Sequence, residues 1–123
     1  RQEVFIVEQR CFYLDCDDLD KNSMHFLGYK KKSLVAYMRV LKNKESKSFI
    51  LGRILVLKEY RKLGLGIKLI KHVLSYIEND NTNFELEMSA QTYLISFYEK
   101  FNFHVKGNEY LDAGIPHVKM IKK

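Results

Sequence analysis

The residues best suited to chemistry form a short basic turn that contains two glycines. Arg61 and Lys62 come just before Gly64 and Gly66, and residues 65–78 then follow a helical pattern. The first N–H groups of a helix have no partner inside it, and the helix dipole adds partial positive charge there. Glycine lets a ligand approach the backbone closely. The turn is therefore suited to binding a phosphate or pyrophosphate, although a helix that simply begins at a glycine-rich turn shows the same pattern.

Two well-known phosphate-binding motifs do not fit this turn. A P-loop needs GxxxxGK[ST] and a dinucleotide fingerprint needs GxGxxG, and in both the position that should be glycine is Leu69. What remains is Arg61-x-x-Gly64-x-Gly66 after a strand. Residues 49–57 are the predicted strand, because their apolar and β-branched side chains are typical of a strand buried on both faces.

The rest of the chain supplies the elements that must position this turn. The helix carries Ile67, Ile70, Leu74 and Ile77 on one apolar face. Short polar turns join the first three strands into an antiparallel meander, and strand, helix and strand form a right-handed parallel crossover. After a segment 1–10 that is either helix or strand, the predicted order is strands 24–29, 34–41 and 49–57, helix 65–78, strand 84–90, helix 94–101, an irregular strand 103–111 and strand 117–121.

Composition indicates one soluble domain, residues 1–123. The net charge of +6 is spread along the chain without a nucleic-acid-binding motif, so no nucleic-acid partner is expected. No run reaches the roughly 18 apolar residues of a membrane helix, and no secretory leader is present, so no membrane partner is expected. Because the sequence starts at Arg1, we expect it to begin inside a longer protein. Cys11 and Cys16 suit neither a zinc site nor a disulfide framework, which favours a reducing cytoplasm.

Residues 13–20 carry four aspartates. They do not form an EF-hand, because its sixth and twelfth positions, counted from Asp15, are Asp20 and Phe26. We therefore expect a solvated turn with helix-capping aspartates and no metal. The alternative function of this run is a negative rim that attracts a cationic amine.

The sequence is similar to the GNAT superfamily of N-acetyltransferases in its turn and in its order of elements. The pyrophosphate loop of that superfamily reads Arg or Gln, two residues, Gly, one residue, and Gly or Ala, as this turn does. The order of elements resembles the GNAT fold from its second strand onward, over nearly the whole chain. Four local matches resemble the ElaA-like branch: residues 4–9, Asp15-x-Asp17-x-x-Asp20, Ala90-Gln91 followed by Phe97-Tyr98-x-x-Phe101-x-Phe103, and residues 114–117.

This resemblance implies an α+β fold with a mixed central sheet flanked by helices, here without its first strand. It also implies acetyl-CoA as the acetyl donor, wedged where the strand before the turn parts from the next parallel strand. The pantetheine arm would extend the first of these strands by β-augmentation. The implied cofactor contacts are the backbone groups of Leu55, Val56, Leu57, Lys62, Leu63, Gly64, Leu65, Gly66 and Ile67, and the side chains of Arg61 and Lys62.

The resemblance further implies that Tyr98 protonates the leaving thiolate and that the N–H of Val56 stabilises the developing oxyanion. Tyr98 also fits the apolar stripe of its helix, where an aromatic residue is usually part of the core. The base that takes the proton of the amine is unresolved, because strand residues 50–54 lack the glutamate that many relatives place there. His117 is a candidate base, although it also fits a structural role after a proline turn, and His25 and Glu8 are weaker candidates.

The predicted function is acetyl-CoA-dependent N-acetylation of a primary amine on a small molecule or protein. A homodimer is compatible with this prediction. The alternatives are a non-catalytic acyl-CoA-binding or sensing module, indicated by the absent glutamate, and a nucleic-acid-binding protein, indicated by the net charge. Arg53 is unusual in an apolar strand. It binds a carboxylate of the substrate, or it pairs with Glu8 or an aspartate of residues 15–20.

Overall fold

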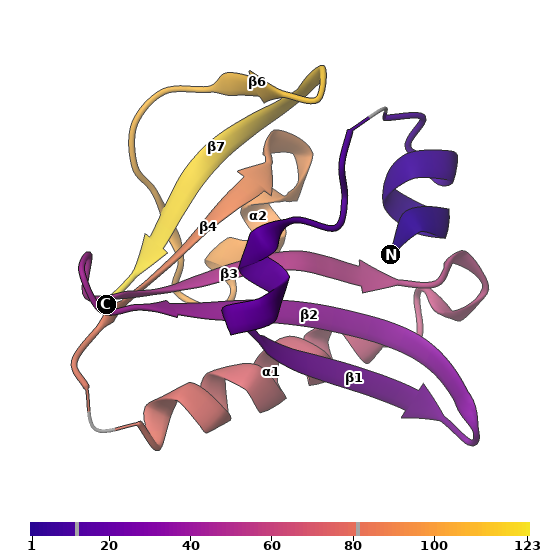
Figure 1. Ribbon diagram of the computed structural model, residues 1–123, viewed down its shortest axis with the longest axis horizontal. Helices are drawn as coiled ribbons and strands as arrows, with labels where there is room; N and C mark the ends of the chain where they lie inside the picture. The colour runs from indigo at the N-terminus through magenta and orange to yellow at the C-terminus, as the bar shows by residue number, and fades with distance from the viewer. Residues whose placement is uncertain (12, 81) are drawn as a thin grey trace.

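The protein is built on a seven-stranded mixed sheet, seen here in a computed structural model that describes every residue except 12 and 81 (Figure 1). The strands run in the order β1-β2-β3-β4-β7-β5, and β6 pairs with β7. The elements are η1 (Glu3–Glu8), η2 (Asp18–Asn22), β1 (Met24–Lys30), β2 (Ser33–Asn43), β3 (Ser48–Val56), η3 (Lys58–Tyr60), α1 (Leu65–Glu78), β4 (Glu85–Gln91), η4 (Thr92–Leu94), α2 (Ile95–Glu99), β5 (His104–Val105), β6 (Tyr110–Asp112) and β7 (Ile115–Lys122).

The topology confirms the predicted meander and crossover. Strands β1, β2 and β3 are antiparallel neighbours, and β3 and β4 are parallel on either side of α1 in the sequence. The irregular strand predicted at 103–111 is wrong as one element. It is two short strands, β5 and β6, which both pair with β7. They are separated by an exposed segment in which Gly107 has a φ of +92°, a conformation that interrupts a strand.

Helix α1 covers one face of the sheet. Its buried residues are Leu69, Ile70, Val73, Leu74 and Ile77, so the predicted apolar face is confirmed except at Ile67. Ile67 is 37% exposed because it lies in the first turn of α1, where the helix meets the cleft described below. The predicted helix 94–101 is shorter than expected: a 3₁₀ turn precedes α2, which spans only Ile95–Glu99.

The N-terminal segment lies against the opposite face. Alternate residues of β2 sort between the two layers: Met38 and Val40 belong to the core under α1, whereas Tyr37 packs with Val4 of η1. The sequence did not decide between helix and strand for residues 1–10, and in the structure Glu3–Glu8 form a helix. The candidate site described below is lined by residues of both layers and of the strands between them.

Strands β3 and β4 pair at one end and then diverge (Figure 1). Their parallel register runs only from Ser48 opposite Glu85 to Leu51 opposite Met88. Just beyond Leu51, β3 carries one extra residue relative to β2, and Arg53 has a φ of +51°. A β-bulge of this kind bends its strand and increases the twist. The bulge therefore explains why β3 turns away from its parallel partner.

Candidate functional site

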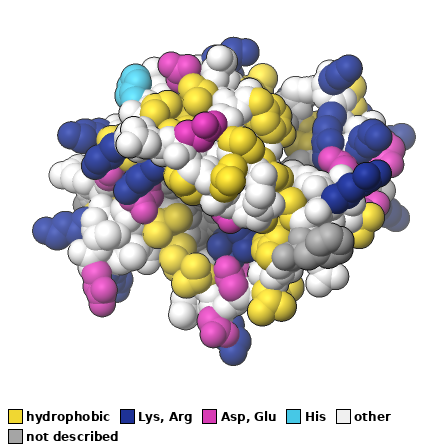
Figure 2. Space-filling view, turned by 90° about the horizontal axis from the view of Figure 1, so that it is seen from above, with side chains coloured by type: hydrophobic (Ala, Val, Ile, Leu, Met, Phe, Trp, Pro, Cys, Tyr) yellow, Lys and Arg dark blue, Asp and Glu magenta, His cyan; other side chains and the backbone are white. Residues whose placement is uncertain are grey.

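A cleft of about 910 Å³ opens where β3 and β4 diverge. The basic turn and the start of α1 form one end, and η1, α2 and β7 contribute walls. Figure 2 views the molecule from above relative to Figure 1, and hydrophobic side chains gather near the middle of this face. Most lysine and arginine side chains on the face lie toward its periphery.

The turn presents unpaired backbone amides to this cleft. Gly64 is the N-cap of α1 with a φ of +75°, which favours glycine. The first helical hydrogen bond runs from the N–H of Lys68 to the carbonyl of Gly64, at 3.1 Å. Within the described part of the chain, no acceptor takes the N–H groups of residues 62–67. The predicted anion-binding geometry is therefore present.

Gly66 lies where the cleft meets the core. A Cβ atom at this position would lie 3.8 Å from Cγ2 of Val56 and 4.0 Å from Cζ of Phe97, two residues of the cleft wall. These are ordinary van der Waals distances, so the protein itself leaves room for one methyl group. A longer side chain would extend into the cleft between β3 and α2.

Leu55, Val56 and Leu57, at and just after the end of β3, were predicted to bind pantetheine through their backbone, but only Val56 directs its peptide groups away from β2 and toward the cleft. The N–H of Leu57 donates to the carbonyl of Val35 in β2 at 2.8 Å. Because alternate residues of a strand point their N–H and C=O groups to opposite sides, the groups of Leu55 also face β2. Leu57 and Leu63 lie outside the cleft lining, whereas all the other predicted cofactor residues line it.

Arg61 is engaged within the protein. Its Nε donates to the carbonyl of Val56 at 2.8 Å, and its two Nη atoms donate to the carboxylate of Glu8 at 2.8 and 3.1 Å. The guanidinium group thus joins η1 to the turn across the mouth of the cleft. Glu8, a weaker candidate for the base, is held in this pair.

Tyr98 is both a core residue and a residue of the cleft wall. It is only 6% exposed and packs edge-on against Phe97 and Phe103, as a core residue does, yet it also lines the cleft. Burial, with a smaller contribution from nearby Tyr93, raises the pKa of the Tyr98 phenol to about 12. The hydroxyl makes no hydrogen bond with the described residues, so it remains available to a ligand.

His117 presents one free ring nitrogen to the cleft. It lies opposite Gln91 in the β4–β7 register, and its Nδ1 is 2.7 Å from the carbonyl of Ile115. A carbonyl can only accept, so Nδ1 carries the hydrogen, and Nε2 of the neutral ring keeps its lone pair. Tyr110 stacks on the ring at a centroid distance of 6.2 Å. His25, in contrast, bonds to Tyr37 and to the carbonyl of Asp20, outside the cleft lining.

The solvated turn predicted for the aspartate run is wrong at Asp15, which is 3% exposed. Its carboxylate pairs with Arg1 and with Arg53, both at 3.0 Å. Arg53 also lies 3.5 Å from Asp17, so the predicted pairing of Arg53 with this run is confirmed. The predicted helix capping is confirmed as well, because Asp17 and Asp20 form a capping box at η2.

Asp20 completes the network by pairing with Arg1 and Arg39. The hydrogen bond from Arg1 is the largest influence on this carboxyl, and it lowers the pKa of Asp20 to about 2. Arg39 is 8% exposed and also pairs with Asp17 at 2.8 Å. Three guanidinium groups thus neutralise three carboxylates, so this run is not the uncompensated negative rim considered above.

Several cleft residues were missed from the sequence. One had a usable signal: Arg39 interrupts the apolar run of β2, as Arg53 interrupts that of β3. Gln9 and Gln91 belong to two of the local matches described above, but those matches gave them no role. Cys11, Tyr13 and Asp112 could be placed at the cleft only by the fold.

Two other features bear on the sequence predictions. Cys11 and Cys16 are free thiols in the structure. No helix in the described ranges is long and apolar enough to cross a membrane, and these ranges hold no group of three potential metal ligands among His, Cys, Asp and Glu.

The mixed seven-stranded sheet with its helices is the fold of acyl-CoA N-acyltransferases, whose solved structures align with this chain. A family model described as an acetyltransferase (GNAT) domain matches residues 3–123. The chain therefore belongs to the GNAT acetyltransferase family, and within it to the ElaA-like branch. Both levels of the predicted resemblance, and the predicted mixed-sheet fold, are confirmed.

The relatives and structural neighbours match almost all of this chain. The ElaA protein of Escherichia coli is 34% identical over 100% of this chain and 82% of its own length. A UPF0039 protein of Synechocystis is 42% identical over 98% of this chain and 80% of its own. The crystal structure of E. coli ElaA aligns with a TM-score of 0.91 over 99% of this chain and 84% of its own.

A crystal structure of an acyl-CoA N-acyltransferase from Pseudomonas aeruginosa is 31% identical and aligns with a TM-score of 0.90, over 99% of this chain and 84% of its own. Membership in the acetyltransferase family confirms acetyl-CoA as the donor. The residues that would hold it are not tested by these comparisons and stay predictions.

Proposed function

We propose that this protein transfers the acetyl group of acetyl-CoA directly to a primary amine of a small molecule or protein. One observation carries the proposal. The hydroxyl of Tyr98, Nε2 of His117 and the amides of the basic turn have no partner among the described residues, and all belong to residues at a single cleft. With its free thiols, the protein suits the reducing cytoplasm.

The cleft fits the donor in shape and in charge. The unpaired N–H groups of residues 62–67 suit the pyrophosphate, and the peptide groups of Val56 suit the pantetheine arm. Arg61 would exchange its bond to the carbonyl of Val56 for the pyrophosphate. When bound, acetyl-CoA supplies an activated thioester.

The residues of the protein then divide the proton transfers. Nε2 of His117 accepts a proton from the amine, which must be neutral to attack. The N–H of Val56 donates to the oxygen that gains charge. Tyr98 donates its proton to the departing thiolate, a role that suits a phenol that stays protonated at neutral pH.

The test follows free thiol release from acetyl-CoA with a panel of amines. We expect turnover with at least one amine, and we expect Tyr98→Phe to slow that turnover by about 100-fold. The affinity for CoA should stay unchanged, because the variant keeps the ring that packs on Phe97. A fully active Tyr98→Phe protein at every pH would remove the acid role from Tyr98.

One observation favours a second candidate, a non-catalytic acyl-CoA sensor. Residues 50–54 of β3 hold no carboxylate, so the base position used by many relatives is absent. This candidate predicts that acetyl-CoA raises the melting temperature while no amine gives turnover. The same panel therefore separates the two functions.

A further inference from the structure

Two arginine side chains lie next to each other on the wall of the cleft, away from the basic turn. Arg39 of β2 pairs with Gly52 in the β2–β3 register, so it is the cross-strand neighbour of Arg53. Both line the cleft, and Asp17 contacts both, at 2.8 Å from Arg39 and 3.5 Å from Arg53. The proposed reaction gives neither arginine a task.

The bulge in β3 is what brings Arg53 to this face. Before the bulge, Phe49 and Leu51 point to the core under α1, whereas after it Ile54 and Val56 do so. The alternation therefore shifts by one residue, and Arg53 joins the face that holds the aspartates. Its backbone has a φ of +51°, a conformation that non-glycine residues adopt mainly where surrounding structure or function requires it.

The two guanidinium groups keep donors that the protein does not use. The bonds of Arg39 to aspartates both come from Nη1, and that of Arg53 to the carbonyl of Asp15 comes from Nη2. Among the described residues, Nε and Nη2 of Arg39 and Nη1 of Arg53 have no hydrogen-bond partner, yet none of them is shut off from solvent. The aspartates thus hold both side chains through other nitrogens, while these donors stay accessible on two residues that line the cleft.

We propose that Arg39 and Arg53 bind a carboxylate of the acceptor, which is therefore a small amine that also carries a carboxylate, such as an amino acid. This inference rests on the proposed acetyl transfer. Planar guanidinium groups match the two oxygens of a carboxylate and hold it in one orientation. The ring of Tyr13, 5.5 Å from the guanidinium of Arg53, forms an adjoining wall of the site.

The first experiment measures binding without turnover. The protein is saturated with CoA and titrated calorimetrically with matched pairs: phenylalanine and phenethylamine, lysine and cadaverine, β-alanine and ethylamine. We expect at least one acid of the panel to bind about tenfold or more tightly than its decarboxylated partner. If no pair shows such a preference, the carboxylate site is overturned. Phosphoethanolamine and ethanolamine form a further pair, and a preference confined to that pair overturns the carboxylate in favour of a phosphate.

Two variants assign the preference to Arg53. Arg53→Gln should remove it. Because this change leaves Asp15 with one fewer partner, Arg53→Lys is the companion variant. It keeps the charge but loses the planar guanidinium group, and it should weaken the binding of the carboxylate-bearing compound by about tenfold. Both should bind CoA as the unaltered protein does, which shows that they are folded. Lys21→Gln is the matched control, since Lys21 is exposed on η2 outside the cleft lining. A folded Arg53→Lys protein with the full preference contradicts the inference.

Thiol release with the same pairs separates this inference from the proposed function. If the acid binds preferentially but releases no thiol from acetyl-CoA, the carboxylate site stands and the transferase proposal fails. If acid and amine are acetylated with equal kcat/KM, and Arg53→Gln changes neither, the transferase proposal stands and the carboxylate site fails. If acetylation favours the acid and Arg53→Gln removes that preference through KM, both stand.

Discussion

At the scale of single residues, the cleft holds a phenol and an imidazole whose reactive atoms have no partner in the described protein. Tyr98 is kept protonated by burial, and His117 keeps a lone pair on Nε2 because its other nitrogen is bonded to Ile115. Both residues line the same cleft, as an acid and a base of one reaction must. Each proposed role leads to a prediction.

Burial of Tyr98 should make the fold sensitive to alkali. Its folded pKa of about 12 lies above the ordinary value of 10, so above pH 10 the unfolded chain loses the proton first. The stability that depends on the protonated phenol is fully present below pH 10. As the pH rises toward 12, the free energy of unfolding falls by about 2–3 kcal/mol. Urea unfolding of Tyr98→Phe should show a correspondingly smaller decline between pH 10 and 12. Equal declines in both proteins would show that the phenol already ionises in the folded state.

A base at His117 should be needed for transfer to the acetylated amine. Its Nε2 would take the proton of the amine, and a glutamine side chain offers no base at this place. His117→Gln should therefore lower kcat/KM by about 100-fold. His104→Gln serves as the control, because His104 is exposed on β5 outside the cleft lining. An unchanged kcat/KM in His117→Gln would transfer the base role to another group.

At the scale of elements, a single extra residue in β3 organises the site. It bends β3 away from β4, which opens the cleft, and it moves Arg53 to the face of the aspartates. The start of α1 then closes one end of the gap with its free amides. Strand divergence and helix position are therefore parts of one arrangement.

The two glycines of the turn should respond differently to substitution. Gly64→Ala should cost about 1–2 kcal/mol of folding stability, because an alanine is strained at a φ of +75°. Gly66→Ala should preserve both stability and CoA binding, since its Cβ meets only ordinary contacts. Gly66→Leu should stay folded but bind CoA at least tenfold more weakly, because its side chain enters the cleft beside Val56 and Phe97. Calorimetric titration with CoA and thermal unfolding measure the two effects, and a Gly66→Leu protein with unchanged affinity would show that the donor does not use this passage.

The elements with strong periodicity could be predicted from sequence, and those governed by tertiary contacts could not. Helix α1 was predicted with its observed bounds because its apolar face and its glycine turn agree. Gly52 and Arg53 interrupt the apolar run of β3, but such an interruption does not reveal how the strand bends, so neither the divergence of β3 nor the direction of its peptide groups could be predicted. The aspartate run appeared solvated because its arginine partners lie 14 to 38 residues away along the chain.

At the scale of the whole molecule, the arginine–aspartate network ties the N-terminal segment and η2 to β2 and β3. The two layers that cover the sheet are thus joined differently. Helix α1 is held by apolar packing, and the N-terminal layer is held largely by ion pairs around a small cluster of Val4, Tyr37 and Leu55.

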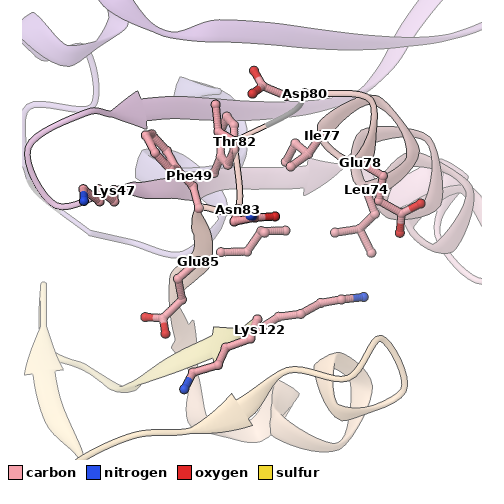
Figure 3. Close-up of a pocket in the computed structure, with 13 residues that line it drawn as sticks. Lys47, Phe49, Leu74, Ile77, Glu78, Asp80, Thr82, Asn83, Glu85 and Lys122 are labelled. Carbon is pink, nitrogen blue, oxygen red and sulfur yellow. The ribbon is translucent and has the colours of Figure 1, made fainter.

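A second pocket of about 560 Å³ lies near the C-terminal end of α1 (Figure 3), where Phe49 and Ile77 meet charged residues of both signs.

The network predicts that the N-terminal layer is sensitive to acid. The pKa of Asp20, about 2, lies below its ordinary value of 3.8, so its contribution is complete above about pH 4 and is lost as the pH falls toward 2. Unfolding curves should show a steeper loss of stability in this window for the unaltered protein than for Asp20→Asn. Asp18→Asn is the matched control, because Asp18 is exposed and makes no ion pair with the described residues. An identical acid response in Asp20→Asn would contradict the role of the network.

The divergence of β3 and β4 also has a consequence for handling the protein. Beyond Leu51 and Met88 the parted strands no longer satisfy each other's peptide groups, and a bare strand margin is a place where other chains add and aggregate. Arg61 donates a hydrogen bond to one carbonyl of this margin, that of Val56, but leaves the N–H of Val56 without a partner among the described residues. The protein without its donor should therefore be the form that aggregates most readily through this strand edge. Coenzyme A in the storage buffer would cover the edge and could be removed again before use.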